Sequence, residues 1–68
     1  MTLNEIILNA VWIDEETSVI VKYQDNSGVD HTLAGGHWFS DQVLYWGAYR
    51  VIKLVMSFDI GEAVFYIA

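Results

Sequence analysis

Apolar and polar residues alternate along two consecutive segments of the chain. In residues 18–24, Val19, Val21 and Tyr23 fall on one face of an extended strand, and the opposite face is half polar. Residues 29–34 repeat this alternation more weakly. Between them lies the tetrapeptide Asp-Asn-Ser-Gly, whose residue types favour tight turns. The pattern therefore predicts two strands that pair as antiparallel neighbours across a short turn.

Two apolar segments later in the chain are also predicted to be strands. Residues 49–56 are β-branched and apolar on both faces apart from Arg50 and Lys53, which is typical of a central strand. Residues 63–68 form the last predicted strand and carry neither a charge nor a proline. If that strand lies at an edge of the sheet, it invites pairing with another chain.

The start of the chain has two interpretations. Thr2 and Glu5 stand at capping-box spacing, and the apolar residues that follow share a helical face, which predicts a helix over residues 2–10. However, residues 10–13 (Ala-Val-Trp-Ile) favour a strand. We expect a strand over residues 5–13, because the polar turn after it then joins it to the next strand as a hairpin.

A short helix of about two turns is predicted from Ser40 to Gly47. Ser40 is a suitable N-cap, Asp41 suits the positive N-terminus of a helix, and Gly47 can end the helix in the left-handed conformation. A longer helix reaching Met56 would also place apolar residues on one face. Gly47 and the β-branched residues after it disfavour that alternative.

These elements give the order β-β-β-α-β-β. The length allows one domain, which we expect to span residues 1–68. Short connections favour antiparallel neighbours. We therefore expect an α+β, β-rich fold, in which five strands and one short helix form an antiparallel sheet or a small, partly open barrel.

The charge balance restricts the partners. Nine acidic residues face three basic ones, so the formal net charge is −6. This sign repels phosphate backbones and anionic lipids, so we expect no direct binding to nucleic acid or membranes. The chain starts without a basic segment and contains no cysteine, and both features fit a cytoplasmic protein. Residues 38–68 are less acidic and more apolar than residues 1–37, so we expect them to be the more buried part.

No pattern of residues points to catalysis or to a bound metal. Cysteine is absent, and the serines occupy predicted turns and element ends. His31 and His37 could ligate a metal together with Asp30 and Asp41, but their spacing is not diagnostic. We therefore expect a non-enzymatic protein with no catalytic residue, no metal and no cofactor.

Two groups of residues remain as candidates for binding. Aromatic side chains are concentrated between residues 38 and 49, and so short a chain has too little interior to bury all of them. Tryptophan and tyrosine often dominate protein interfaces. Carboxylates in the turns form the second group, because complementary charge speeds the encounter with a partner. The candidate partner-binding residues are Asp14, Glu15, Glu16, Asp25, Asp30, Trp38, Phe39, Trp46 and Tyr49.

These groups predict a small protein-binding module, most simply an inhibitor that docks by an acidic and aromatic surface on a basic, nucleic-acid-binding partner protein. Anti-restriction and anti-CRISPR inhibitors of phages share this size and acidity, a likeness of bulk properties only. The alternative is a structural homo-oligomer, such as a homodimer, or an accessory subunit buried through its aromatic face and C-terminal strand. A third interpretation is a small-ligand module with an aromatic-lined pocket.

Overall fold

The first residues form a helix that begins at a complete capping box. In the computed structural model, which describes residues 1–68, α1 spans Leu3–Asn9. The Thr2 hydroxyl accepts a hydrogen bond from the Glu5 amide at 3.3 Å, and the Glu5 carboxylate accepts one from the Thr2 amide at 3.0 Å. The strand expected over residues 5–13 is therefore wrong, and the alternative helix indicated by the capping box is correct.

Packing and pairing explain why the helix is preferred here. Leu3 and Ile7, one helical turn apart, are both buried in the core. An extended segment would find no partner at the expected place, because the strand at residues 18–24 is already paired along both of its edges. The helix satisfies its own backbone groups and needs no such partner.

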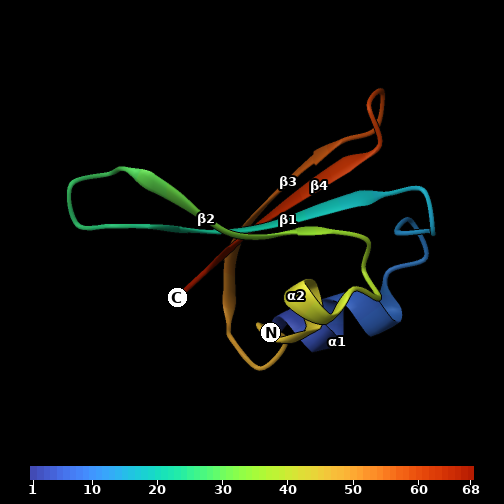
Figure 1. Ribbon diagram of the computed structural model, residues 1–68, viewed down its shortest axis with the longest axis horizontal. Helices are drawn as coiled ribbons and strands as arrows, with labels where there is room; N and C mark the ends of the chain where they lie inside the picture. The colour runs from blue at the N-terminus through green and yellow to red at the C-terminus, as the bar shows by residue number, and fades with distance from the viewer.

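Four strands and one further helix follow α1 (Figure 1). The strands lie in the order β2-β1-β4-β3 in one open sheet, which confirms a β-rich α+β fold but gives four strands and no barrel. The β1–β2 and β3–β4 pairs are antiparallel, whereas β1 and β4 run parallel. The elements are β1 Ser18–Gln24, β2 Asp30–Gly36, α2 Asp41–Leu44, β3 Val51–Ser57 and β4 Glu62–Ile67.

The second helix is a single turn. Its N-cap is Ser40, as expected, and the Ser40 hydroxyl accepts a hydrogen bond from the Val43 amide at 3.4 Å. It ends earlier than expected because residues 45–48 form turns. Gly47 is not in the left-handed conformation; instead it is buried, and a Cβ there would collide with the side chain of Asn4. Gly47 therefore allows this turn to approach α1 closely.

Both helices lie on the same side of the sheet, and the core lies between (Figure 1). Neither is long and apolar enough to cross a membrane. On the sheet, the residues that face the helices are the buried ones, and those on the opposite side are not covered by a helix. The buried apolar residues are Leu3, Ile7, Ile13, Val19, Val21, Ala34, Val43, Ala63, Phe65 and Ile67.

Of the two C-terminal strands, β3 lies at the edge of the sheet and β4 lies in its centre. β3 pairs only with β4 and is an edge strand with mostly exposed side chains, so the central strand expected at residues 49–56 is wrong. β4 occupies the centre, between β1 and β3, so residues 63–68 do not offer an edge for pairing. Residues 38–68 are consequently not the more buried part of the chain.

Candidate functional site

Two loops meet at one end of the sheet, on the right of Figure 1. The loop of residues 10–17 precedes β1, and the turn of residues 58–61 joins β3 to β4. The Ser18 amide donates a hydrogen bond to the Gly61 carbonyl oxygen at 2.8 Å, which connects the two segments. We call these two loops the acidic end, because they hold no lysine or arginine and contain Asp14, Glu15, Glu16 and Asp59.

Three large apolar side chains are exposed at the acidic end: Val11, Phe58 and Ile60. Phe58 is 74% exposed and Ile60 is 66% exposed. Both border an open hollow of about 390 Å³. Apolar side chains and uncompensated negative charge therefore occupy the same end of the molecule. The other residues that line the hollow are Trp12, Asp14, Glu16, Thr17, Met56 and Gly61.

Asp14 fixes the shape of its loop. Its Oδ1 atom accepts hydrogen bonds from the Thr17 hydroxyl and amide, both at 3.0 Å, and from the Glu16 amide at 2.9 Å. These bonds, the one from the Thr17 hydroxyl above all, hold the pKa of Asp14 below its ordinary value. Glu15 and the side chain of Glu16 are exposed and remain free to face a partner.

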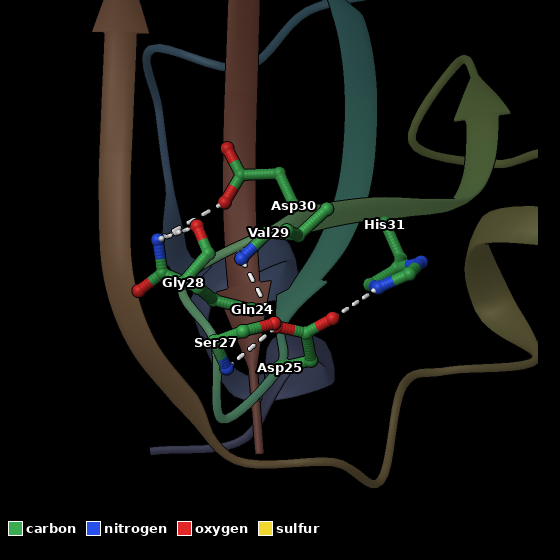
Figure 2. A network of polar contacts seen from close by, with 7 residues as sticks. All are labelled: Gln24, Asp25, Ser27, Gly28, Val29, Asp30 and His31. Carbon is green, nitrogen blue, oxygen red and sulfur yellow. Dashed lines mark hydrogen bonds and ion pairs between the residues drawn. The ribbon is translucent and has the colours of Figure 1, made fainter.

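At the opposite end of the sheet, Asp25 organises the β1–β2 turn (Figure 2). Its Oδ1 atom accepts hydrogen bonds from the Ser27 hydroxyl at 2.7 Å, the Ser27 amide at 2.9 Å and the Val29 amide at 3.0 Å. Its Oδ2 atom lies 2.8 Å from Nε2 of His31. The His31 contact is the largest cause that lowers the pKa of Asp25, followed by the Ser27 hydroxyl bond.

Asp30 ties this hairpin to the centre of the sheet. Its Oδ1 atom accepts a hydrogen bond from the side-chain amide of Gln24 at 3.2 Å, and its Oδ2 atom accepts one from the Tyr66 hydroxyl at 2.9 Å. The bond to the carboxylate raises the pKa of Tyr66, because an ionised phenolate would lose that bond and face a like charge. Since Tyr66 belongs to β4, the contact spans β1.

The five candidate carboxylates therefore do not form one surface. Residues 14–16 precede β1, whereas Asp25 and Asp30 lie beyond its other end. A seven-residue strand separates the two groups by roughly 20 Å. Only the first group lies beside exposed apolar side chains without a basic residue nearby; the second is engaged in the hydrogen bonds of the hairpin.

A second candidate surface follows α2. The ring centroids of Tyr45 and Trp46 lie 5.0 Å apart at 78°, and those of Trp46 and Tyr49 lie 5.2 Å apart. Trp46 packs partly against the core, whereas Tyr45 is 75% exposed. We call this the aromatic surface, and it comprises Tyr23, Leu33, Tyr45, Trp46, Tyr49 and Ile52.

Two open hollows of the aromatic surface share Leu33 and Trp46. One measures about 300 Å³ and includes Tyr23, and the other measures about 350 Å³ and includes Asp41. Two register shifts supply apolar residues to the first hollow. The β1–β2 register skips Leu33, and the β3–β4 register skips Ile52. A bulge redirects the side chain it carries, which explains why these residues join the aromatic group.

The remaining candidate aromatics lie elsewhere. Trp38 and Phe39 belong to the connection between β2 and α2, and their rings meet edge to face with centroids 5.4 Å apart. Phe39 also stacks on His37 at 5.2 Å. Neither lines the hollows of the aromatic surface, so Trp46 and Tyr49 are the two candidate aromatics that it contains.

The acidic end contains two residues that sequence reasoning missed. Phe58 and Ile60 flank Asp59 in a turn, and neither side chain is buried there. Two apolar residues in the short segment between the strands predicted at residues 49–56 and 63–68 were a usable signal of an exposed apolar site. The bulged residues Leu33 and Ile52 gave no such signal, because a bulge depends on how the strands pair.

No three histidine, cysteine, aspartate or glutamate side chains lie close enough together to hold a metal ion. The candidate site therefore consists of an acidic end with exposed apolar side chains and, apart from it, an aromatic surface. Comparisons with protein-family models, with curated proteins and with solved structures find no match for this chain.

Proposed function

We propose that this chain is a non-enzymatic protein-binding module that docks on a basic surface of another protein through its acidic end. One observation carries the proposal: Phe58 and Ile60 are 74% and 66% exposed within two loops that hold four carboxylates and no basic residue. The apolar side chains would supply affinity, and Glu15, Glu16 and Asp59 would attract the partner.

The distribution of the basic residues supports this orientation. Lys22 stands near the end of β1, Arg50 directly before β3, and Lys53 near the start of β3. All three therefore lie toward the end of the sheet opposite the acidic end. A separation of charge along the sheet orients an approaching basic protein toward the acidic end before contact.

The apolar residues supply the stabilising contact. Transferring one large apolar side chain from water to a packed interface is worth about 1.5–3 kcal/mol. Phe58 and Ile60 are available for this, and the hollow between them and Trp12 can receive a partner's side chain. A partner whose basic groove binds nucleic acid would be blocked by such docking, which makes the module an inhibitor.

The proposal is tested with the whole chain as bait in a nuclease-treated lysate of the source cells. Phe58→Ser should abolish capture of the specific partner, because loss of an exposed aromatic anchor costs about 2 kcal/mol or more in binding. Leu8→Ser is the matched control, since Leu8 is 77% exposed but lies on α1. Equal capture by the wild type and by the Phe58 variant would overturn the proposal.

The role of charge is tested with the purified partner. The triple variant Glu15→Gln, Glu16→Gln, Asp59→Asn keeps Asp14, which holds the loop, and removes three exposed charges. We expect slower association and a weaker dependence of the rate on salt. An unchanged association rate at low salt would show that the acidic end does not attract the partner.

The alternative, an accessory subunit buried through the aromatic surface, rests on the exposed Tyr45, whose ring meets Trp46 edge to face. Tyr45→Ala would remove the exposed ring and leave the core intact. If that variant loses the captured partner while the Phe58 variant keeps it, the aromatic surface is the binding site.

A further inference from the structure

The side of the sheet that faces away from the helices has an ordered pattern of charge. We call it the open sheet face. Strand pairing aligns its side chains in rows that run across the strands, because paired residues point to the same side. The central row is apolar and consists of Gly35, Ile20, Val64 and Val55. A basic row lies on one side of it and consists of Thr32, Lys22, Tyr66 and Lys53. An acidic row lies on the other side and consists of Ser18, Glu62 and Ser57.

The central row is apolar and lacks a cover. Ile20 and Val64 lie on the two central strands and are only half-buried, and Val55 on the edge strand β3 is 41% exposed. Both helices lie on the other side of the sheet (Figure 1). An antiparallel-rich sheet can expose one face to water, but that face is then usually polar along its middle. An apolar centre therefore indicates a face that becomes covered.

The charged rows show what fits there. In the basic row, Lys22 and Lys53 lie on either side of Tyr66, and the Lys53 ammonium is 5.1 Å from the centre of the Tyr66 ring. In the acidic row, Glu62 lies on the same strand as Tyr66, on the far side of the apolar row. Asp30 lies on the same face beyond the basic row, and its carboxylate accepts a hydrogen bond from the Tyr66 hydroxyl at 2.9 Å. One side of the apolar centre therefore carries Lys22, Lys53 and Asp30, two positive charges and one negative charge, and the other side carries the negative charge of Glu62.

Such a pattern is complementary to itself. We propose that the open sheet face binds a second copy of this chain, with the two sheets face to face about a two-fold axis that runs along the apolar row. That axis reverses the strand direction in the second copy. Glu62 of each copy then lies over Tyr66 of the other, between Lys22 and Lys53, and the apolar rows meet in the middle.

The size of the face sets the expected affinity. Four strands about 4.8 Å apart, each about seven residues of 3.3 Å long, give a footprint of roughly 440 Å² per copy. That lies below the roughly 800 Å² per partner of a standard interface. We therefore expect a weak, reversible dimer with a dissociation constant in roughly the micromolar to millimolar range.

Sedimentation equilibrium of the pure chain over a concentration series tests the proposal. Lys53→Glu and Glu62→Lys should each raise the dissociation constant of the dimer about tenfold or more, because each change places like charges opposite one another at two symmetric contacts. A one-to-one mixture of the two variants should restore association, since the new carboxylate at position 53 of one variant then faces the new ammonium at position 62 of the other. Circular dichroism confirms that each variant is folded.

Glu15→Lys is the control, because it makes the same charge change as Glu62→Lys at a loop residue that belongs to none of the three rows. It should leave the dimer unchanged. A chain that remains monomeric across the series, or a mixture that fails to restore association, would overturn the proposal. A dimer that is lost in Tyr45→Ala and kept in Lys53→Glu would also overturn it, because association would then use the aromatic surface. All of these measurements use the pure chain, so none of the results depends on a partner protein that binds the acidic end.

Discussion

β3 and β4 are adjacent, antiparallel and similarly apolar, yet they differ sharply in burial. In β4 every second residue is buried, and Phe65 is completely inaccessible. In β3 Leu54 pairs directly with Phe65 but is 38% exposed, and Ile52 is 57% exposed. β4 has a strand on both sides, whereas β3 has one, and α2 packs over β1 and β2 instead. Position in the sheet, more than apolar content, decides which strand belongs to the core.

The substitution with the largest expected loss of folding stability is Phe65→Ala, in the buried strand β4. Removing a fully buried ring costs about 3–5 kcal/mol, which equals or exceeds the stability of many domains of this size. We expect no cooperative unfolding transition in urea, followed by tryptophan fluorescence. Phe65→Leu keeps most of the volume and should stay folded with a lower urea midpoint. A stable, cooperative Phe65→Ala variant would contradict the central place of β4.

Leu54→Ala makes a smaller change at the paired position on β3. Because Leu54 is partly exposed, we expect a loss of about 1 kcal/mol in the free energy of unfolding. The measurement is the same urea titration at low protein concentration, where association is minimal. A loss as large as that in a fully buried leucine, above about 2.5 kcal/mol, would show that β3 is covered in the monomer.

Ile52→Thr should have a still smaller effect. Ile52 sits at the bulge and is more than half exposed, and threonine keeps a β-branched side chain suited to a strand. We expect a change in unfolding free energy within about 0.5 kcal/mol. A clear loss of stability would indicate that the hollow beside Tyr49 is closed in solution.

A pH titration tests the β1–β2 hairpin, which lies on the opposite side of β4 from β3. The folded-state pKa of Asp25 is lowered, first by His31, so its contribution to stability is present above the unfolded-state pKa of about 4. That contribution is lost progressively as the pH falls below this value. Asp25→Asn should be less stable at neutral pH and should lose less stability on acidification. Parallel curves for the two proteins would contradict this role.

Local signals in the sequence were enough to identify several elements. The Asp-Asn-Ser-Gly turn of residues 25–28 lies between two strands, and Gly28 has a φ of 84°, as a tight turn requires. Ser40 caps α2 as predicted. Thr2 and Glu5 form the capping box that indicated a helix, although a strand was the expected element there. Each feature depends on residues within four positions of one another, so spacing alone could indicate it.

The arrangement of the strands could not be predicted in the same way. β1 and β4 pair in parallel although β2, α2 and β3 separate them along the chain, and no local pattern reports such pairing. The same limit applies to the sites. The acids of residues 14–16 were found from composition, but their proximity to Phe58 and Ile60 arises only when β1 and β4 lie together. The bulges at Leu33 and Ile52 likewise depend on register.

The parallel contact between β1 and β4 also has a consequence for the order of folding. The β1–β2 and β3–β4 hairpins join neighbouring segments, so each can close quickly. Val19 meets Ala63 only after a loop of more than forty residues has closed, which is entropically costly and slow. We therefore expect two early hairpins and a late, rate-limiting step that joins them. Until that step, the apolar edges of β1 and β4 are unpaired, and the chain is most prone to aggregate.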